Sequence, residues 1–337
     1  MQNKRALITG VTGMVGSHLA DYLLAHTDWE IYGACRWRSP LDNIAHLLPR
    51  VDAGDRVHMV EFELRDMVSL TRMAEKVAPD YVFHLAAQSF PSTSFAAPLD
   101  TLDTNILGTA RLLEALRHLG GQPLIHVCAS SEVFGRVPAD KLPIAEDCTF
   151  HPASPYAISK VGTDLLGRFY AEAYGMAVMT TRMFTHTGPR RGDVFAESSF
   201  AKQIAMIEAR MVPPVLRTGN LKSMRTWADV RDAVRAYHLL LTVNPEPGAY
   251  YNIGGGFSCT VEDMLNHLLS LSTRKDIRVE TAPERLRPID ADLQIPNTGK
   301  FRRHTGWEPR ISFEQTMGDL LDYWRTRVRT GLALASR

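Results

Sequence analysis

A tyrosine and a lysine lie four residues apart in the segment SPYAISK, residues 154–160. On a helix this spacing places both side chains on one face. The Lys160 ammonium can then lie near the Tyr156 phenol and lower its pKa, which makes Tyr156 a usable general acid or base near neutral pH. The pair could also be two unrelated residues on a helix surface, so its interpretation depends on the elements around it.

Two further polar residues follow the apolar run LIHVCA, residues 124–129, which is typical of a buried strand. Ser130 and Glu132 come directly after this run. Ligands of open α/β sheets bind at the carboxyl ends of the strands. The sequence therefore predicts a catalytic site made of Ser130, Glu132, Tyr156 and Lys160.

The chain begins with the pattern strand, glycine turn, helix. Residues 5–9 are a strand candidate, and the turn GVTGMVG at residues 10–16 leads into a helical spacing of leucines. Glycines let the backbone approach a pyrophosphate, and a helix N-terminus supplies N–H donors and the positive end of a dipole. We therefore expect a dinucleotide site. The residues expected in this turn site are Gly10, Thr12, Gly13, Met14, Val15 and Gly16.

The loop after the second expected strand, residues 30–34, carries Arg36, Arg38 and Ser39 and no carboxylate. Arginine accommodates a ribose 2′-phosphate, whereas an acidic side chain would bind the 2′-hydroxyl of NAD. We therefore predict NADP; the alternative is that these arginines are solvated loop charges. Tyr156 and Lys160 are also expected to touch the cofactor. The other expected cofactor contacts, after the third, fourth and sixth strands, are Glu63, Leu64, Leu85, Ala86, Ala87, Phe184 and His186.

Composition excludes several classes of protein as default interpretations. The 337 residues are 45% hydrophobic, enough for one large domain or two closely packed ones. The net charge is +1 without a basic block, so neither nucleic acid nor a membrane surface is an expected partner. No signal segment or membrane span is recognisable. The four cysteines lack metal-ligand spacing, so we expect no metal and no disulfide framework, in a soluble cytoplasmic protein.

The order of the elements predicts an α/β fold, a Rossmann-type doubly wound parallel sheet with a smaller C-terminal substrate-binding lobe. Residues 1–184 are expected to be mainly the NADP-binding domain, and 185–337 mainly the substrate lobe, with some strands and helices returning to the first domain. Strands are predicted at 57–62, 81–87 and 177–184 besides those above, and a helix at 102–119. Asn105 on that helix is expected to be structural. An apolar stripe near the end is expected to be core: Phe313, Met317, Leu320, Leu321 and Trp324.

Taken together and in this order, the glycine turn, LAAQS at 85–89, SSE at 130–132 and Tyr156-x-x-x-Lys160 resemble the extended short-chain dehydrogenase/reductases that modify sugar nucleotides. The resemblance covers essentially the whole chain. Within that group the chain is most similar to the GDP-mannose 4,6-dehydratases and nearly as similar to the GDP-4-keto-6-deoxy-mannose reductases.

Different segments carry the two resemblances. Gln88-Ser89, the SSE triplet, GPRRG at 188–192 and the arginine-serine loop at 36–39 match the dehydratases, as does the chain length. Val15, SFAKQ at 199–203 and DVRD at 229–232 match the reductases. Thr185 replaces an asparagine of both groups, and Asp290 replaces a glutamate that helps to hold the nucleotide.

The dehydratase resemblance implies GDP-mannose or a related nucleotide sugar as substrate, a homodimer or homotetramer, and internal hydride transfer through NADP. It assigns the C4 proton to Tyr156, assisted by Lys160 and Ser130, and the C5 proton and the leaving C6 hydroxyl to Glu132. The isolated residues Arg217, Arg225 and Arg287 are candidates for a substrate diphosphate, because arginine binds phosphate in a bidentate fork. The residues expected to bind substrate are Gln88, Ser89, Ser131, Thr185, Arg191, Asn220, Arg225, Arg287 and Asp290.

Two alternatives remain open at this point. A reductase needs only Ser130, Tyr156, Lys160 and external NADPH, which leaves Glu132 as a polar neighbour of the site. A non-catalytic, NADP-sensing scaffold is also possible, since a fold alone does not fix a function. The intact Tyr156 and Lys160 pair argues against the scaffold, because a sensor does not need an activated phenol.

Overall fold

The computed structural model describes residues 3–286 and 291–332. The strands are β1 (Arg5–Thr9), β2 (Glu30–Cys35), β3 (Val57–Glu61), β4 (Tyr81–His84), β5 (Leu124–Cys128), β6 (Val178–Met183), β7 (His186–Thr187), β8 (Val215–Thr218), β9 (Met224–Asp229), β10 (Tyr250–Ile253), β11 (Phe257–Thr260), β12 (Arg278–Thr281) and β13 (Leu293–Gln294). The α-helices are α1 (Met14–His26), α2 (Leu48–Ala53), α3 (Met67–Val77), α4 (Pro91–Ala96), α5 (Pro98–Leu102), α6 (Gly108–His118), α7 (Pro155–Tyr174), α8 (Ala196–Glu208), α9 (Val230–Thr242), α10 (Val261–Ser270), α11 (Gly299–Thr305) and α12 (Phe313–Arg329). Short 3₁₀ turns are η1 (Asp42–Leu47), η3 (Ser131–Phe134), η4 (Ala139–Lys141) and η5 (Pro283–Arg285), and η2 (Asp103–Leu107) is a π-helical turn.

Within the described residues, seven strands form one parallel sheet in the order β10-β6-β5-β4-β1-β2-β3. The chain leaves β1 toward β3 on one side and returns at β4 on the other, so the topological switch point lies between β1 and β4. The register pairs Thr9 with His84 and His84 with Val127. Because all these strands run the same way, the segments that follow β1, β4, β5 and β6 lie along one edge of the sheet.

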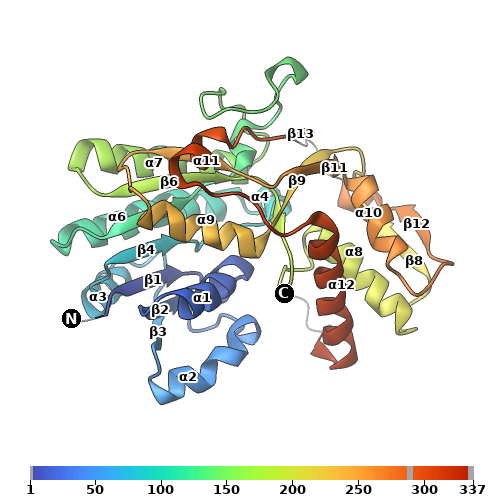
Figure 1. Ribbon diagram of the computed structural model, residues 1–337, viewed down its shortest axis with the longest axis horizontal. Coiled ribbons are helices and arrows are strands. Elements are labelled where there is room, and N and C mark those ends of the chain that lie inside the picture. The colour runs from blue at the N-terminus through green and yellow to red at the C-terminus, as the bar shows by residue number, and fades with distance from the viewer. Residues whose placement is uncertain (1–2, 287–290, 333–337) are drawn as a thin grey trace.

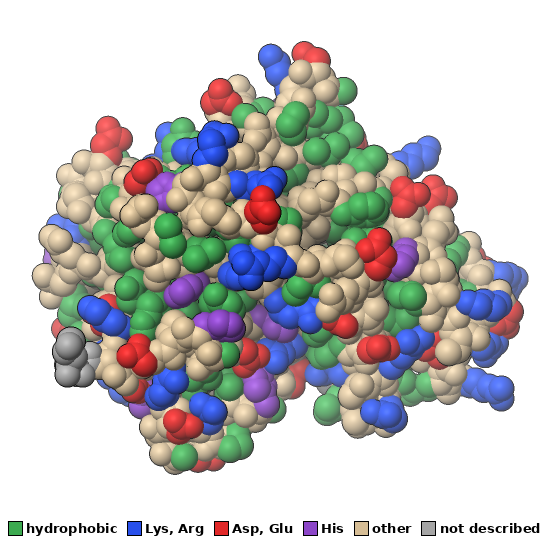
Figure 2. All heavy atoms as spheres, viewed as in Figure 1, with side chains coloured by type: hydrophobic (Ala, Val, Ile, Leu, Met, Phe, Trp, Pro, Cys, Tyr) green, Lys and Arg blue, Asp and Glu red, His purple; other side chains and the backbone are tan. Residues whose placement is uncertain are grey.

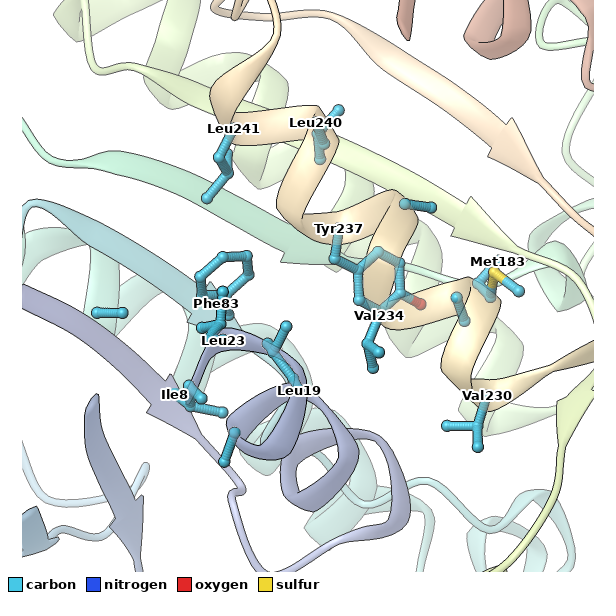
Figure 3. Packing of buried hydrophobic residues seen from close by; sticks show 14 of the residues in the cluster. Ile8, Leu19, Leu23, Phe83, Met183, Val230, Val234, Tyr237, Leu240 and Leu241 are labelled. Atoms are coloured by element: carbon cyan, nitrogen blue, oxygen red, sulfur yellow. The ribbon is translucent and has the colours of Figure 1, made fainter. Parts of the chain in front are cut away.

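Helices cover both faces of this sheet (Figure 1). On one face α1 and α9 pack against the strands through leucine, valine and aromatic side chains; Figure 3 shows Leu19 and Leu23 of α1 opposite Val234 and Leu241 of α9. On the other face α3, α6 and α7 close a second cluster with the strands. These residues are almost completely removed from water, so the sheet is a rigid support for the segments at its edge.

A smaller lobe lies beside the sheet, at the right of Figure 1. Its core joins α8, α10 and α12 to β8, β9 and β11. All five residues of the predicted C-terminal stripe, from Phe313 to Trp324, are buried in this cluster, so the interpretation as core packing is confirmed. Strand β9 pairs with β7, β11 and β13, and β12 pairs with β8.

The predicted Rossmann-type sheet is confirmed, with changes at the ends of elements. β4 ends at His84, so residues 85–87 belong to the loop after it. The single helix predicted at 102–119 is divided into α5, η2 and α6. The π-helical turn η2 contains Asn105, which is buried and hydrogen-bonded to Gln88 and Ser159, so its structural role is also confirmed. The seventh strand, β10, comes from the C-terminal half of the chain.

The surface carries mixed charge. Figure 2 shows basic, acidic and hydrophobic side chains interspersed over the face seen in Figure 1, without one continuous basic area there. In the part of the chain that the structure describes, no helix combines the length and hydropathy that a membrane span requires.

Candidate active site

A cavity of about 890 Å³ lies at the carboxyl edge of the sheet, between the two lobes. Its walls come from the glycine turn after β1, the segment after β5, the first turns of α7 and the loop between β6 and α8. Residues 219–225 and 284–286 of the smaller lobe close the far end. Segments that are distant in sequence thus share one concave site, where a ligand with several chemical parts can be held.

The structure brings the four predicted catalytic residues into this cavity. Ser130 caps η3 by accepting a hydrogen bond from the Glu132 amide at 3.2 Å, and η3 presents Glu132 to the cavity. Tyr156 and Lys160 project from the start of α7, where Pro155 and the Ser154 cap fix the first turn. Both residues are buried: Tyr156 is 8% exposed and Lys160 is 7% exposed.

The predicted activation of the phenol by the ammonium is not what the structure shows. The Lys160 ammonium donates to the carbonyl oxygen of Cys128 at 2.7 Å. Burial raises the pKa of Tyr156 above its ordinary value, although a hydrogen bond with Ser130 and the charge of Arg191 act in the opposite direction. Burial also lowers the pKa of Lys160. Desolvation therefore outweighs the charge effect that the spacing alone suggested.

A buried hydrogen-bond network fixes the strand ends under the cavity. The Thr9 hydroxyl accepts from the amides of Leu85 and Ala86, both at 3.1 Å, so its own hydrogen goes to Nδ1 of His84 at 3.0 Å. Nε2 of His84 then donates to Thr109 at 3.0 Å. Burial lowers the pKa of His84 to about 3, in agreement with this neutral form.

The network continues to α7. Thr109 donates to the backbone oxygen of Asn105 at 2.6 Å, and the Asn105 amide donates to Ser159 at 2.8 Å. Ser159 in turn donates to the backbone oxygen of Tyr156 at 2.7 Å. The ends of β1 and β4 and the start of α7 are therefore held in one mutual arrangement.

The glycine turn fits a dinucleotide pyrophosphate. Gly10 has a φ of +73°, and a Cβ on it would lie 3.0 Å from the backbone of Ala86. A Cβ on Gly16 would lie 2.4 Å from the carbonyl oxygen of Gly10. Only glycine therefore allows this tight floor. Helix α1 begins here without a side-chain cap and without an acidic residue in its first turn, so its N–H groups and dipole favour an anion.

A second hollow, of about 810 Å³, lies beyond the ends of β2 and β3. Arg36, Arg38 and Glu63 line it, together with Glu61, which is paired in the sheet with the last residue of β2. The loop after β2 carries no acid, as predicted, but β3 brings carboxylates to the same hollow. Ser39 closes the loop by donating its amide to the Arg36 carbonyl oxygen at 2.9 Å.

The remaining expected cofactor residues are placed as follows. Leu85, Ala87, Phe184 and His186 line the main cavity with Gly10, Gly13, Met14, Val15 and Gly16. Thr12 and Ala86 support the turn through their backbones, and Leu64 is buried against Gly108. Burial and the charge of Arg191 lower the pKa of His186 to about 4, so this imidazole is neutral. Nowhere among residues 3–286 and 291–332 do three or more potential metal ligands gather.

Of the expected substrate residues, Ser89, Ser131, Thr185, Arg191, Asn220 and Arg225 line the cavity. Gln88 differs. Its side chain forms hydrogen bonds with Phe90 and Thr101, which stabilise the loop after β4, and it does not face the cavity. Arg217 is exposed on β8, outside the lining residues. Arg287 and Asp290 lie outside the described residues.

The structure adds two residues that the sequence did not indicate. Glu197 of α8 is 4% exposed and accepts from Nε of Arg191 at 3.0 Å, while the Arg191 guanidinium lies 3.4 Å from the centre of the Phe195 ring. Arg285 lines the far end of the cavity and donates to Ser199 at 2.9 Å. Neither residue belongs to a motif, so only the fold shows that they lie here.

Comparison with known proteins shows the family of the chain. A family model described as GDP-mannose 4,6 dehydratase matches residues 7–320. The chain is 31% identical to a GDP-6-deoxy-D-mannose reductase of Pseudomonas aeruginosa, over 97% of this chain and 99% of that protein. It is also 31% identical to a GDP-mannose 4,6-dehydratase of Vibrio cholerae, over 94% of this chain and 93% of that protein.

Solved structures show the same architecture. The RMD structure of Pseudomonas aeruginosa, complexed with NADPH, has a TM-score of 0.81 at 29% identity and covers 96% of this chain and 100% of that one. DesIV, a dTDP-glucose 4,6-dehydratase of Streptomyces venezuelae with NAD and TYD bound, has a TM-score of 0.85 at 27% identity, with 96% and 98% covered. With the glycine turn, the Tyr156 and Lys160 pair and the family match over residues 7–320, the chain belongs to the GDP-mannose 4,6-dehydratase family of extended short-chain dehydrogenase/reductases.

Proposed function

We propose that this protein is a sugar-nucleotide 4,6-dehydratase that converts GDP-mannose to GDP-4-keto-6-deoxy-mannose, with NADP as its cofactor. The observation that carries the proposal is the place of Glu132 in the same cavity as Ser130, Tyr156 and Lys160. The charge of Glu132 contributes to the raised pKa of Tyr156. A dehydration needs a second acid/base group beside the one that serves hydride transfer.

In this proposal Tyr156 accepts the proton of the sugar C4 hydroxyl while its carbon is oxidised. NADP held on the glycine turn would supply the acceptor for the C4 hydride and the donor of that hydride to C6, and its oxidised form would add positive charge to the site. Ser130 hydrogen-bonds the phenol, and Ser130 and Arg191 both favour its ionised form. Glu132 removes the C5 proton, made acidic by the 4-ketone, and gives it to the departing C6 hydroxyl, which leaves as water. The proton held by Tyr156 returns to the sugar when C5 is protonated, so atoms and charges balance.

The far end of the cavity suits a diphosphate. Arg225 and Arg285 line it with Asn220, and Gly219 lies close to the Arg285 backbone, where a Cβ would be 2.7 Å from its carbonyl oxygen. Arginine recognises phosphate oxygens through paired N–H donors. We place the nucleotide diphosphate there, in the lobe of residues 185–337. We place the sugar over Tyr156 and the cofactor on the glycine turn, both in the lobe of residues 1–184.

NADP is proposed over NAD because Arg36 and Arg38 follow β2 in the second hollow. Glu61, Glu63 and Asp66 weaken this preference, since carboxylates repel a 2′-phosphate, but α3 adds Arg72 and Lys76 to the same walls. Four basic side chains thus stand against three acidic ones, a net charge of +1. The RMD structure of Pseudomonas aeruginosa was solved with NADPH, which supports this choice.

We also propose a homodimer or homotetramer. An exposed apolar face runs over neighbouring elements that pack together, α5, η2 and α7. Its residues are Leu99, Leu107, Ile158, Leu165 and Phe169, each between 47% and 78% exposed. A face of this kind is typical of a protein interface. Light scattering should show more than one chain per particle, and Phe169→Glu should reduce that number.

The second candidate is the NADPH-dependent reductase of the GDP-4-keto-6-deoxy sugar. The observation that favours it is the 31% identity to a reductase over 97% of the chain. That reaction requires Ser130, Tyr156 and Lys160 and leaves Glu132 without a catalytic role. The two candidates therefore differ in one side chain that the structure places in the cavity.

The test is direct. Purified protein is incubated with GDP-mannose and a trace of NADP, and products are examined by mass spectrometry. Loss of one water without net cofactor reduction supports the dehydratase. NADPH oxidation with the 4-keto-6-deoxy sugar nucleotide, and no water loss from GDP-mannose, supports the reductase. Cofactor binding without either reaction supports the sensing scaffold.

Glu132→Gln tests the role of the carboxylate. It should abolish water loss while cofactor affinity is kept, because the amide cannot take the C5 proton. Glu262→Gln, on the exposed side of α10, is the matched control and should dehydrate at the wild-type rate. Undiminished dehydration by Glu132→Gln would remove Glu132 from the mechanism.

A further inference from the structure

A buried guanidinium lies beneath the catalytic residues, on β6. The Arg182 side chain is 1% exposed, and its partner Asp164 on α7 is fully buried. Nε of Arg182 donates to Asp164 Oδ2 at 2.7 Å and Nη2 donates to Oδ1 at 3.0 Å, which is a bidentate pair. Nη1 donates to the carbonyl oxygen of Glu146 at 2.6 Å. All three nitrogens of the planar fork are therefore used, each in a fixed direction.

Three aromatic rings surround the same guanidinium. Its carbon lies 4.5 Å from the centre of the Tyr250 ring, 4.7 Å from Phe150 and 5.4 Å from Phe134. Phe134 is completely buried and also packs on Phe184, which lines the active-site cavity. A cation in this position is attracted by the ring faces, more strongly because water is excluded.

The contacts of Arg182 join the two elements that carry the proposed catalytic groups. Asp164 stands four residues after Lys160 on α7, and Phe134 stands two residues after Glu132 in η3. We propose that Arg182 is a positioning residue, which holds α7 against η3 so that Tyr156 and Lys160 meet Ser130 and Glu132 at the working distance. This inference rests on the proposed function and deepens it.

The alternative is that the pair only stabilises the fold. Replacing a buried ion pair by apolar side chains of similar volume is often neutral or stabilising, whereas removing one partner leaves an uncompensated charge. Stability is thus a weak reason for such a pair, but its geometry is specific. Methionine and leucine can fill the space of Arg182 and Asp164, yet they supply no directed bond between β6 and α7. A displacement of about 1 Å of a catalytic group can slow a reaction about 100-fold.

The test is the double variant Arg182→Met/Asp164→Leu, which leaves no buried charge unpaired. We expect it to unfold at a temperature close to that of the wild type and to keep the KM for GDP-mannose. The kcat for water loss should fall about 100-fold. A folded double variant with wild-type kcat would overturn the proposal.

A second variant covers the case in which the double variant does not fold. Asp164→Glu keeps the ion pair but lengthens the link to α7 by one methylene, so we expect a folded protein with reduced kcat and unchanged KM. Wild-type kcat in this variant would overturn the proposal as well. The control is Arg325→Met/Glu208→Leu, another bidentate pair at 2.8 Å, which joins α12 to α8 away from the catalytic elements and should not alter kcat.

Failure of the proposed function is recognised separately. Wild-type protein that removes no water from GDP-mannose would contradict the dehydratase assignment, whatever the variants do. If it instead oxidises NADPH with the 4-keto-6-deoxy sugar nucleotide, the same variants are compared on that reaction. Ser130 and Tyr156 come from the same two elements, so the expected loss of kcat without a change in KM still applies, and its absence still refutes the role of Arg182.

Discussion

The loop that brings Arg191 into the cavity is fastened to α1, the helix that follows the glycine turn. Nε2 of His18 is 3.1 Å from the carbonyl oxygen of Pro189, and Arg190 pairs with Asp21 at 2.7 Å. Arg190 has a φ of +69°, the left-handed conformation that side chains disfavour. Because this strained loop and the glycine turn line one cavity, its attachment to α1 should slow the escape of a bound dinucleotide.

Asp21→Asn weakens this attachment by removing the charge that Arg190 contacts. Asp21 also pairs with His46 at 2.7 Å, so two contacts change together. The Arg190 and Asp21 side chains are 20% and 32% exposed, and a pair of that exposure is worth about 0.5–1 kcal/mol. Since 1.4 kcal/mol corresponds to a factor of ten, we expect cofactor to leave about two- to fivefold faster.

The assay is displacement of bound NADPH by excess NADP, followed by the change in NADPH fluorescence. The association rate should change little, because the loop need not be closed when the cofactor enters. Asp55→Asn is the matched control, because Asp55 forms an exposed pair with Arg50 at 3.2 Å, away from the loop. An unchanged dissociation rate in Asp21→Asn, or an equal increase in Asp55→Asn, would refute the reasoning.

Three further predictions concern the cofactor site and acid stability. Gly16→Ala places a methyl group 2.4 Å from a backbone oxygen of the turn. It should lower the free energy of unfolding by about 1–3 kcal/mol, measured by thermal unfolding, and weaken NADPH binding in a fluorescence titration. Unchanged stability and affinity would contradict the tight turn. The double variant Arg36→Ser/Arg38→Ser should lower the affinity for NADP and leave the affinity for NAD unchanged, as measured by calorimetry. Equal losses of affinity for both cofactors would argue against a 2′-phosphate site. Burial lowers the pKa of His84 and His126 from 6.5 to about 3 each, so below pH 6.5 the unfolded chain binds protons that the folded chain does not. Stability should therefore fall as pH decreases from 6.5, and an unfolding temperature that stays constant down to about pH 5 would show that these residues are not buried as neutral groups.

Much of the site could be predicted because the required information is local. The glycine turn directly follows β1, Ser130 and Glu132 directly follow β5, and the helical spacing of Tyr156 and Lys160 fixes their common face. The parallel arrangement of the strands then places these segments at one edge. The predicted sheet and the meeting of these residues in one cavity both follow from patterns a few residues long.

The rest depends on contacts between distant segments. Arg285 and Glu197 face the cavity because the smaller lobe folds over the sheet, and no short pattern around them indicates this. Gln88 is in a family motif, but its side chain does not face the cavity. Its backbone amide donates a hydrogen bond to Asn105, and its side chain hydrogen-bonds its own loop. The raised pKa of Tyr156 also depends on the assembled fold, because burial is its main cause and the local spacing of Tyr156 and Lys160 does not show it.

In our proposal, the difference between a dehydratase and a reductase lies in how η3 places Glu132. Ser130, Tyr156 and Lys160 would serve hydride transfer in both proposed reactions, so their presence cannot separate the two. Glu132 separates them only where η3 holds its carboxylate over the sugar. Gly135 ends that turn with a φ of +56°, and a Cβ on it would lie 1.6 Å from the carbonyl oxygen of His151, so the turn is held tightly on this side as well as by the packing of Phe134 on Arg182. A turn fixed from both sides is what a carboxylate needs in order to remove one particular proton, whereas a polar neighbour of a reductase site needs no such restraint.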